Sequence, residues 1–170
     1  SMNAKYDLVE DGQASYTPSE QRGKKLFFTE YNEFLPNKSG ADCAHCHGAP
    51  NFENGKFMNN GLDKDSEFKD NGLEDVTSLA IDIAKFKVPT LRNIELTFPY
   101  MHDGRFSTLE EVIDHYNSGI DSSSTLDGAL LATKRTGLRL SAQDKLDLVA
   151  FLKTLTDPTL KDVEEYKTPF

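Results

Sequence analysis

The chain has 170 residues, which fits one domain or one domain with tails, because domains most often contain roughly 100–150 residues. Its 28 acidic and 19 basic side chains give a formal net charge of −9, so its surface would repel nucleic acid and anionic membranes. No stretch reaches the roughly 18–20 apolar residues that a membrane span requires, and the modest apolar content, 37%, indicates a core completed by a bound group.

Residues 1–16 have no sustained periodicity and are predicted to form a tail or an interdomain linker. The N-terminus lacks the apolar core of a signal peptide, and Ser1 before Met2 resembles a cleavage remnant. The absence of an export signal therefore excludes no compartment.

The first predicted helix begins after Thr17. Thr17 and Glu20 form a capping box with proline at the first helical position, and the helix should run to about Phe28. Gly23 and Phe27 lie on one face of it, so a second helix can approach closely there. A polar connection follows over residues 32–42.

The next segment, residues 43–47, has the pattern C-x-x-C-H, which is typical of covalent haem attachment. One helical turn places the thiols of Cys43 and Cys46 along one porphyrin edge and directs His47 to the iron. A zinc site would need a second ligand pair, and a thioredoxin-like redox pair would need a βαβ setting. The sequence shows neither, so haem c, one per chain, is the predicted cofactor.

Residues 48–75 are rich in Gly, Asn and Asp, and we expect a long irregular loop that wraps the cofactor. A short apolar stretch, residues 76–86, is predicted to be helical. Pro50 follows the C-x-x-C-H pattern closely, and its carbonyl is a candidate acceptor for the His47 ring N–H. Arg92 is a candidate partner for a haem propionate or a plain surface residue.

Two further helices are predicted in the C-terminal third. The first is capped by Ser107 or Thr108, ends at Gly119, and has a buried stripe; the second is capped by Ser141. The apolar stripe of the first helix consists of Leu109, Val112, Ile113 and Tyr116. That of the second consists of Leu146, Val149, Leu152 and Leu155. The predicted class is all-α, with a haem domain over residues 17–158 and a tail over residues 159–170.

The sixth iron ligand decides what the haem can do. Met101 lies in a proline-stiffened segment before a helix, which can hold one side chain rigidly over a haem face. The alternatives are Met58, His45, His102, His115 or an open iron; His45 and His115 are each expected to face solvent. An open iron can bind peroxide or small gases.

Several motifs in the same order resemble the C-terminal haem domain of the bacterial dihaem cytochrome c peroxidase/MauG family. They extend from near Thr17 to residue 152 and include FKVPTLRN, PYMHDGRF, TLEEV and DLVAFL at residues 86–93, 99–106, 108–112 and 147–152.

The resemblance implies a cytochrome c-like helical fold with long irregular loops around one covalently attached haem, with His47 and Met101 as axial ligands. In this family the domain carries the high-potential electron-transferring haem, supplied by a small donor such as cytochrome c or a cupredoxin. The peroxide-reducing haem lies in a separate N-terminal domain, which this sequence does not contain. The resemblance also implies a periplasmic or other extracytoplasmic location.

The alternatives are an enzyme with a displaced sixth ligand, a MauG-like oxidase domain, or a structural or sensing haem domain. A monohaem peroxidase would use His102 or Glu95 as an acid–base group. MauG proteins use a tyrosine ligand, which directs attention to Tyr100. Some relatives hold calcium between their domains, but no carboxylate cluster in this sequence specifies such a site.

Overall fold

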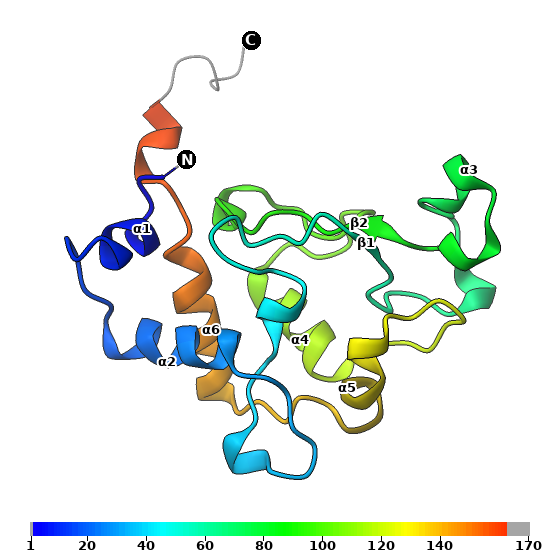
Figure 1. Ribbon diagram of the computed structural model, residues 1–170, viewed down its shortest axis with the longest axis horizontal. Coiled ribbons are helices and arrows are strands. Elements are labelled where there is room, and N and C mark those ends of the chain that lie inside the picture. The colour runs from blue at the N-terminus through cyan, green and yellow to red at the C-terminus, as the bar shows by residue number, and fades with distance from the viewer. Residues whose placement is uncertain (1, 163–170) are drawn as a thin grey trace.

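Most helical residues lie in two groups. The computed structural model describes residues 2–162. In Figure 1, one group is formed by the first two helices and the last, and the other by two helices beside the loops. The first group consists of α1 (Lys5–Glu10), α2 (Pro18–Phe28) and α6 (Ala142–Lys153), and the second of α4 (Leu109–Ser118) and α5 (Leu131–Thr136).

The middle of the chain is irregular, as expected, and includes one small sheet. Strands β1 (Phe57–Met58) and β2 (Phe86–Lys87) pair antiparallel. The helix expected over residues 76–86 is shorter: α3 covers only Glu74–Thr77 and is followed by a 3-10 turn. Ile81 is 69% exposed, so no buried apolar face supports a longer helix.

The predicted caps are confirmed. The side-chain oxygens of Thr17, Thr108 and Ser141 accept from the third backbone N–H of α2, α4 and α6. Helix α5 was not predicted, because no side-chain cap precedes it and its residues show no strong apolar period.

Helices α2 and α6 touch at Gly23, as its position opposite a second helix suggested. A Cβ atom added there would lie 1.9 Å from the backbone oxygen of Asp147. Only glycine permits this approach. The Asp147 side chain, 1% exposed, accepts from Arg22 Nε at 2.6 Å and from Ser19 Oγ at 2.6 Å, so a polar anchor reinforces the contact.

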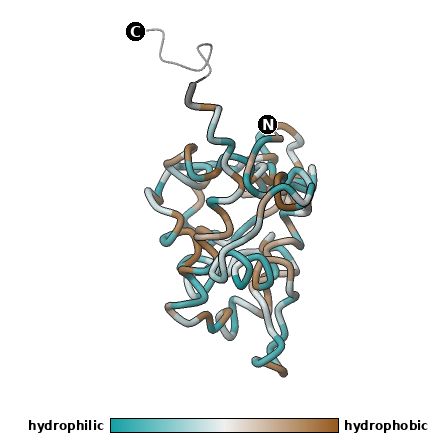
Figure 2. Tube along the Cα trace, turned by 90° about the vertical axis from the view of Figure 1, so that its left-hand side faces the viewer, coloured by the Kyte–Doolittle hydropathy of each residue, from teal (hydrophilic) through white to brown (hydrophobic). Residues whose placement is uncertain are grey.

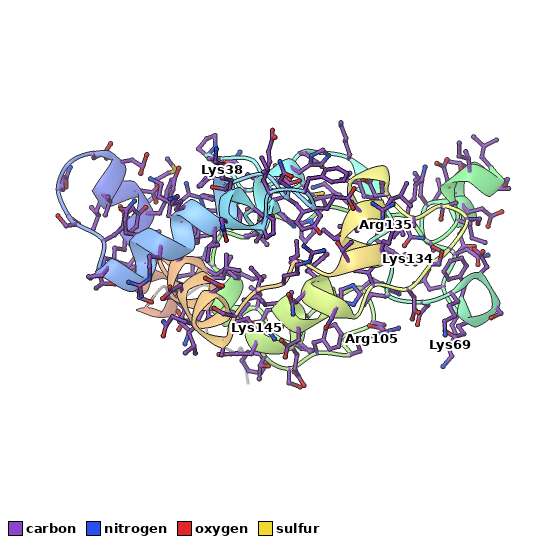
Figure 3. All side chains as sticks on the ribbon, turned by 90° about the horizontal axis from the view of Figure 1, so that it is seen from below. Lys38, Lys69, Arg105, Lys134, Arg135 and Lys145 are labelled. Atoms are coloured by element: carbon purple, nitrogen blue, oxygen red, sulfur yellow. The ribbon has the colours of Figure 1, made fainter. Side chains whose placement is uncertain are left out.

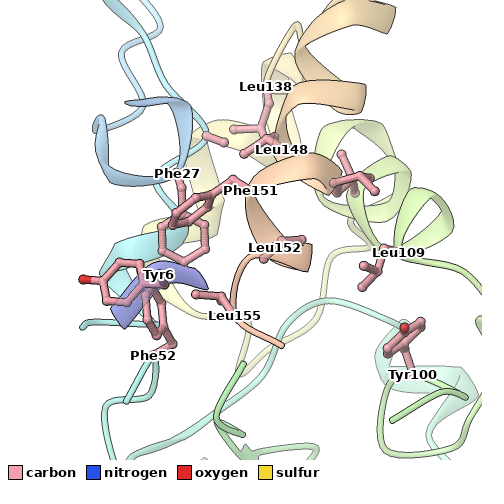
Figure 4. Packing of buried hydrophobic residues seen from close by; sticks show 13 residues of the cluster. Tyr6, Phe27, Phe52, Tyr100, Leu109, Leu138, Leu148, Phe151, Leu152 and Leu155 are labelled. Atoms are coloured by element: carbon pink, nitrogen blue, oxygen red, sulfur yellow. The ribbon is translucent and has the colours of Figure 1, made fainter. Parts of the chain in front are cut away.

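Aromatic rings fill the space beside this helix pair (Figure 4). The Phe151 ring lies 5.2 Å from that of Phe27 and 6.3 Å from those of Phe52 and Tyr6, centroid to centroid. The buried stripe of α6 differs from the predicted one, because Leu146 is 55% exposed. The α6 side chains in the core are Leu148, Val149, Phe151 and Leu152.

Residues 1–16 differ from the expected tail. Helix α1 places Tyr6 in the core, and the Tyr6 backbone N–H donates to the Thr154 carbonyl at 2.9 Å. The helix is capped by Ala4, which gives no sequence signal, and Tyr6 is one aromatic residue among many polar ones. In the predicted tail 159–170, residues 163–170 lie outside the described part of the chain.

Hydrophobic residues occur as short stretches separated by hydrophilic ones along the whole trace (Figure 2). Within residues 2–162, no helix has the length and apolar content needed to cross a membrane.

Candidate haem site

The C-x-x-C-H segment forms one tight turn. A 3-10 turn spans Cys43–His45, and the His47 N–H closes a further helical turn by donating to the Cys43 carbonyl at 2.9 Å. Cys43 and Cys46 are half-buried and are not joined to each other. The predicted helical turn is therefore present, with both thiols on a segment that ends at His47.

Burial keeps both thiols in the protonated form. Burial raises the pKa of Cys43 to about 12 and that of Cys46 to about 11, whereas reactive and metal-binding cysteines have lowered values. No group of three or more His, Cys, Asp or Glu side chains within residues 2–162 is arranged to hold a metal ion. Two thiols on one turn, followed directly by a histidine, fit the pattern of covalent haem attachment.

Backbone carbonyls orient the imidazole of His47. His47 Nδ1 lies 3.1 Å from the Phe52 oxygen, so Nδ1 carries the proton and Nε2 is the nitrogen suited to bind iron. Burial lowers the His47 pKa, which favours the neutral ring that a metal needs, and the carbonyls of Phe52 and Pro89 act in the opposite direction.

Pro50 was predicted to supply the carbonyl that Phe52 supplies. The chain turns between them, and Phe52 adopts a left-handed φ of 55°. The Pro50 carbonyl instead accepts from Arg92, at 2.9 Å from Nε and 2.7 Å from an Nη atom. Only the three-dimensional course of the turn distinguishes the two acceptors.

Arg92 links two segments of the chain that are far apart in the sequence. Its buried guanidinium contacts Asp7 Oδ2 at 2.7 Å and the Pro50 carbonyl, joining α1 to the loop that follows His47. No contact in the structure tests the propionate pairing predicted for Arg92, and the two partners described here account for its burial.

Met101 lies at the start of a closed loop. The Tyr100 N–H donates to the Phe106 carbonyl at 2.7 Å, which joins the two ends of the loop. Met101 has a φ of 73°, a left-handed conformation that is uncommon for a methionine. The surrounding structure therefore holds the Met101 backbone in a conformation that is otherwise unfavourable, as at many functional sites.

The Met101 sulfur shares a hydrogen-bond donor with a tyrosine of α4. Asn60 Nδ2 donates to Met101 Sδ at 3.4 Å and to the Tyr116 hydroxyl at 3.4 Å. Burial raises the pKa of Tyr116 to about 12, the Asn60 hydrogen bond lowers it, and Cys46 and Cys43 raise it further. Tyr116 therefore lies within electrostatic reach of both thiols, and Met101 belongs to the same part of the molecule.

Met58, the other candidate methionine ligand, has a similar partner. Met58 Sδ accepts from Asn54 Nδ2 at 3.3 Å, on strand β1 beside Phe86. The exposed His102 ring stacks on Phe86 with 3.7 Å between centroids. Met58 thus stays an alternative ligand, and His102 is held in a stack beside it.

The remaining candidates lie elsewhere. His45 is exposed, as predicted. His115 is 6% exposed, contrary to the prediction, because the Asn60 carbonyl accepts from its Nε2 at 3.0 Å. Tyr100 donates its hydroxyl to the Ile94 carbonyl at 3.0 Å, and Glu95 accepts from Thr156 at 3.0 Å.

Sequence reasoning missed Phe52 as the His47 partner and missed Asn60 altogether. The Asn60-Gly61 pair indicates only a turn, and Asn60 and Met101 are 41 positions apart. Tyr116 was found only as a stripe residue of its helix. Taken together, two neutral thiols, an oriented imidazole and a loop-held thioether fit a covalently bound haem.

Comparisons with known proteins agree with this site. No protein-family model matches the chain. It is 32% identical to the cytochrome-c peroxidase IdrP1 of a Pseudomonas strain, over 85% of this chain and 42% of that protein. It is 34% identical to the cytochrome c551 peroxidase of Nitrosomonas europaea, over 82% of this chain and 35% of that protein.

Among solved structures, a MauG-like protein associated with microbial copper homeostasis superimposes with a TM-score of 0.82 and 38% identity. The match covers 99% of this chain and 52% of that protein. The chain therefore spans about half or less of the length of the relatives that it matches.

Proposed function

Because the chain belongs to the bacterial dihaem cytochrome c peroxidase/MauG family, whose members are haem c proteins, we propose that it is a one-electron transfer domain with a single covalent haem c. The observation that supports this proposal is the combination of an oriented His47 on the two-cysteine turn with a thioether, Met101, on a closed loop where Asn60 contacts its sulfur. The haem supplies iron that cycles between the ferric and ferrous states.

Four side chains would hold the haem, each through a different contact. Cys43 and Cys46 would hold the haem through thioether bonds to its vinyl carbons, and His47 would ligate through Nε2, with its proton kept at Nδ1 by the Phe52 carbonyl. Met101 would supply a second ligand, and a thioether ligand raises the reduction potential. Electron transfer through such a haem needs no acid or base.

The contacts of the acid–base candidates favour electron transfer over a separate peroxidase activity. His102 is stacked on Phe86, and Glu95 is engaged by Thr156. We place peroxide reduction, as in the full-length relatives, in a second haem domain that works with this one. The resemblance supports assignment to the C-terminal half of such a protein and a periplasmic or other extracytoplasmic location.

The partner that delivers electrons is proposed to be a small redox protein, cytochrome c or a cupredoxin. The net charge of −9 suits a basic donor. Seen from below, the labelled basic side chains are spread over the length of the molecule and do not gather in one patch (Figure 3). Arg135 and Lys145 among them are paired with Glu33 and Asp114.

The proposal is tested by the absorption spectra of the haem-loaded protein in both oxidation states, before and after peroxide. We expect a ferric sulfur-to-iron band in the parent protein and none in Met101→Ala, because alanine removes the ligand sulfur. We also expect peroxide to perturb only the variant. A parent protein that lacks the band and reacts directly with peroxide would overturn the electron-transfer assignment.

A further inference from the structure

We propose that Asn60 is a positioning residue that orients the Met101 sulfur and sets the reduction potential of the haem through an amide–sulfur hydrogen bond. This inference rests on the proposed function, since it takes Met101 as the sixth ligand.

The geometry restricts what Asn60 can do. Its side chain is half-buried, and its two amide protons have two acceptors, Met101 Sδ and the Tyr116 hydroxyl, each 3.4 Å away. Both contacts come from one NH2 group, so the position of the thioether is tied to that of a ring on α4. A methionine side chain is otherwise flexible, with three rotatable bonds.

Backbone contacts hold Asn60 in place from the other side. Its carbonyl accepts from Nε2 of the buried His115 at 3.0 Å, and the next residue, Gly61, has a φ of 70° that turns the chain. The Gly61 N–H donates to the Asn59 side chain at 2.8 Å. The amide is therefore presented by a rigid turn, which is a requirement for a group that orients a ligand.

The electronic consequence has a definite direction. A hydrogen bond to a thioether withdraws electron density from the sulfur, and the ferric iron depends on that density more than the ferrous iron does. The contact therefore favours the reduced state. Loss of the Asn60 amide should lower the potential and loosen the sulfur on its loop.

The chain contains a matched control. Asn54 Nδ2 makes the same kind of contact to the other candidate sulfur, Met58 Sδ, at 3.3 Å. Substitution of each asparagine by leucine removes an amide of the same size beside one sulfur and leaves the other untouched. The comparison of Asn60→Leu with Asn54→Leu therefore separates the two methionines.

The experiment is a spectroelectrochemical titration of the haem-loaded variants, with the ferric sulfur-to-iron band recorded in parallel. For Asn60→Leu we expect an at least about three-fold shift toward the ferric state, about 30 mV at 59 mV per tenfold change, and a weakened band. Asn60→Gln, which keeps an amide, should restore part of the shift. Asn54→Leu should change neither quantity.

Two results would overturn the inference: an unchanged potential and band in Asn60→Leu, or a shift in Asn54→Leu alone. Should Asn60→Leu fail to fold, Asn60→Ser tests the same contact, because the backbone carbonyl that holds His115 is retained. Met101→Leu distinguishes the two proposals. If it leaves the band intact, the proposed ligand set fails; if it abolishes the band while Asn60→Leu changes nothing, only the role of Asn60 fails.

Discussion

The helical region, α1, α2 and α6, and the loop region, residues 48–106, are stabilised by different interactions. The helical region is held by aromatic rings in edge-to-face and tilted contact and by the close helix crossing at Gly23. The loop region is held by polar contacts between distant residues, and its backbone is left-handed at Phe52, Asn93 and Met101. The first provides stability, and the second provides the positions of the groups that we assign to the haem.

Phe52 belongs to both regions. Its ring is fully buried, 4.8 Å from the Tyr6 ring and 5.7 Å from the Phe27 ring, while its carbonyl orients His47. The helical core therefore fixes the orientation of the imidazole. A stable core is a condition for a well-defined iron ligand.

The largest expected effect comes from Phe151→Ala in the helical region. The ring is fully buried among other rings, so its removal should lower the free energy of unfolding by about 3–5 kcal/mol, measured by urea denaturation. Ile81→Ala in the loop region is the control, and at 69% exposure it should change that quantity by less than about 0.5 kcal/mol. Equal losses would contradict the division of roles.

The next effect is a pH dependence that originates in the helical region. The hydrogen bond from Arg22 lowers the pKa of Asp147 from 3.8 to about 2. The carboxylate therefore stabilises the fold above the unfolded pKa, and this contribution of about 1–2 kcal/mol is lost as the pH falls through the folded value. Urea denaturation of the parent protein and of Asp147→Asn between pH 6 and about pH 2 measures it. The variant should lack this part of the acid sensitivity; an identical slope would contradict it.

The smallest expected effect is the loss of unfolding free energy when one of two helix caps is removed. Thr17→Ala removes the acceptor for the Glu20 N–H, and Thr108→Ala removes the corresponding acceptor for the Glu111 N–H. Each should cost about 1 kcal/mol in urea denaturation. The costs should match because Leu109 and Ile113 of α4 share one core with α6, so α2 and α4 unfold in the same transition. A cost seen for only one cap would show separate unfolding.

Features that a local stretch of sequence encodes could be predicted, whereas contacts between distant residues could not. Capping boxes at Thr17, Thr108 and Ser141 and the spacing of Cys43, Cys46 and His47 are local, so they could be recognised. The burial of His115 and the choice of Phe52 over Pro50 depend on groups brought together by folding, which no local pattern encodes. Leu146 belongs to the apolar stripe predicted for α6 but is exposed. Apolar spacing along a helix therefore locates the buried face only to within about one residue.

The contacts of Arg92 with Asp7 and Pro50 affect where the protein can be attached to an electrode or to a fusion partner. Asp7, near the N-terminus, shares the Arg92 guanidinium with the Pro50 carbonyl, and Pro50 is two residues before the carbonyl that orients His47. A mechanical load applied at the N-terminus would therefore reach the iron ligand through very few links. Anchoring through the exposed Val76 of α3, which lies at the other side of the molecule from α1 (Figure 1), would keep such a load away from the imidazole.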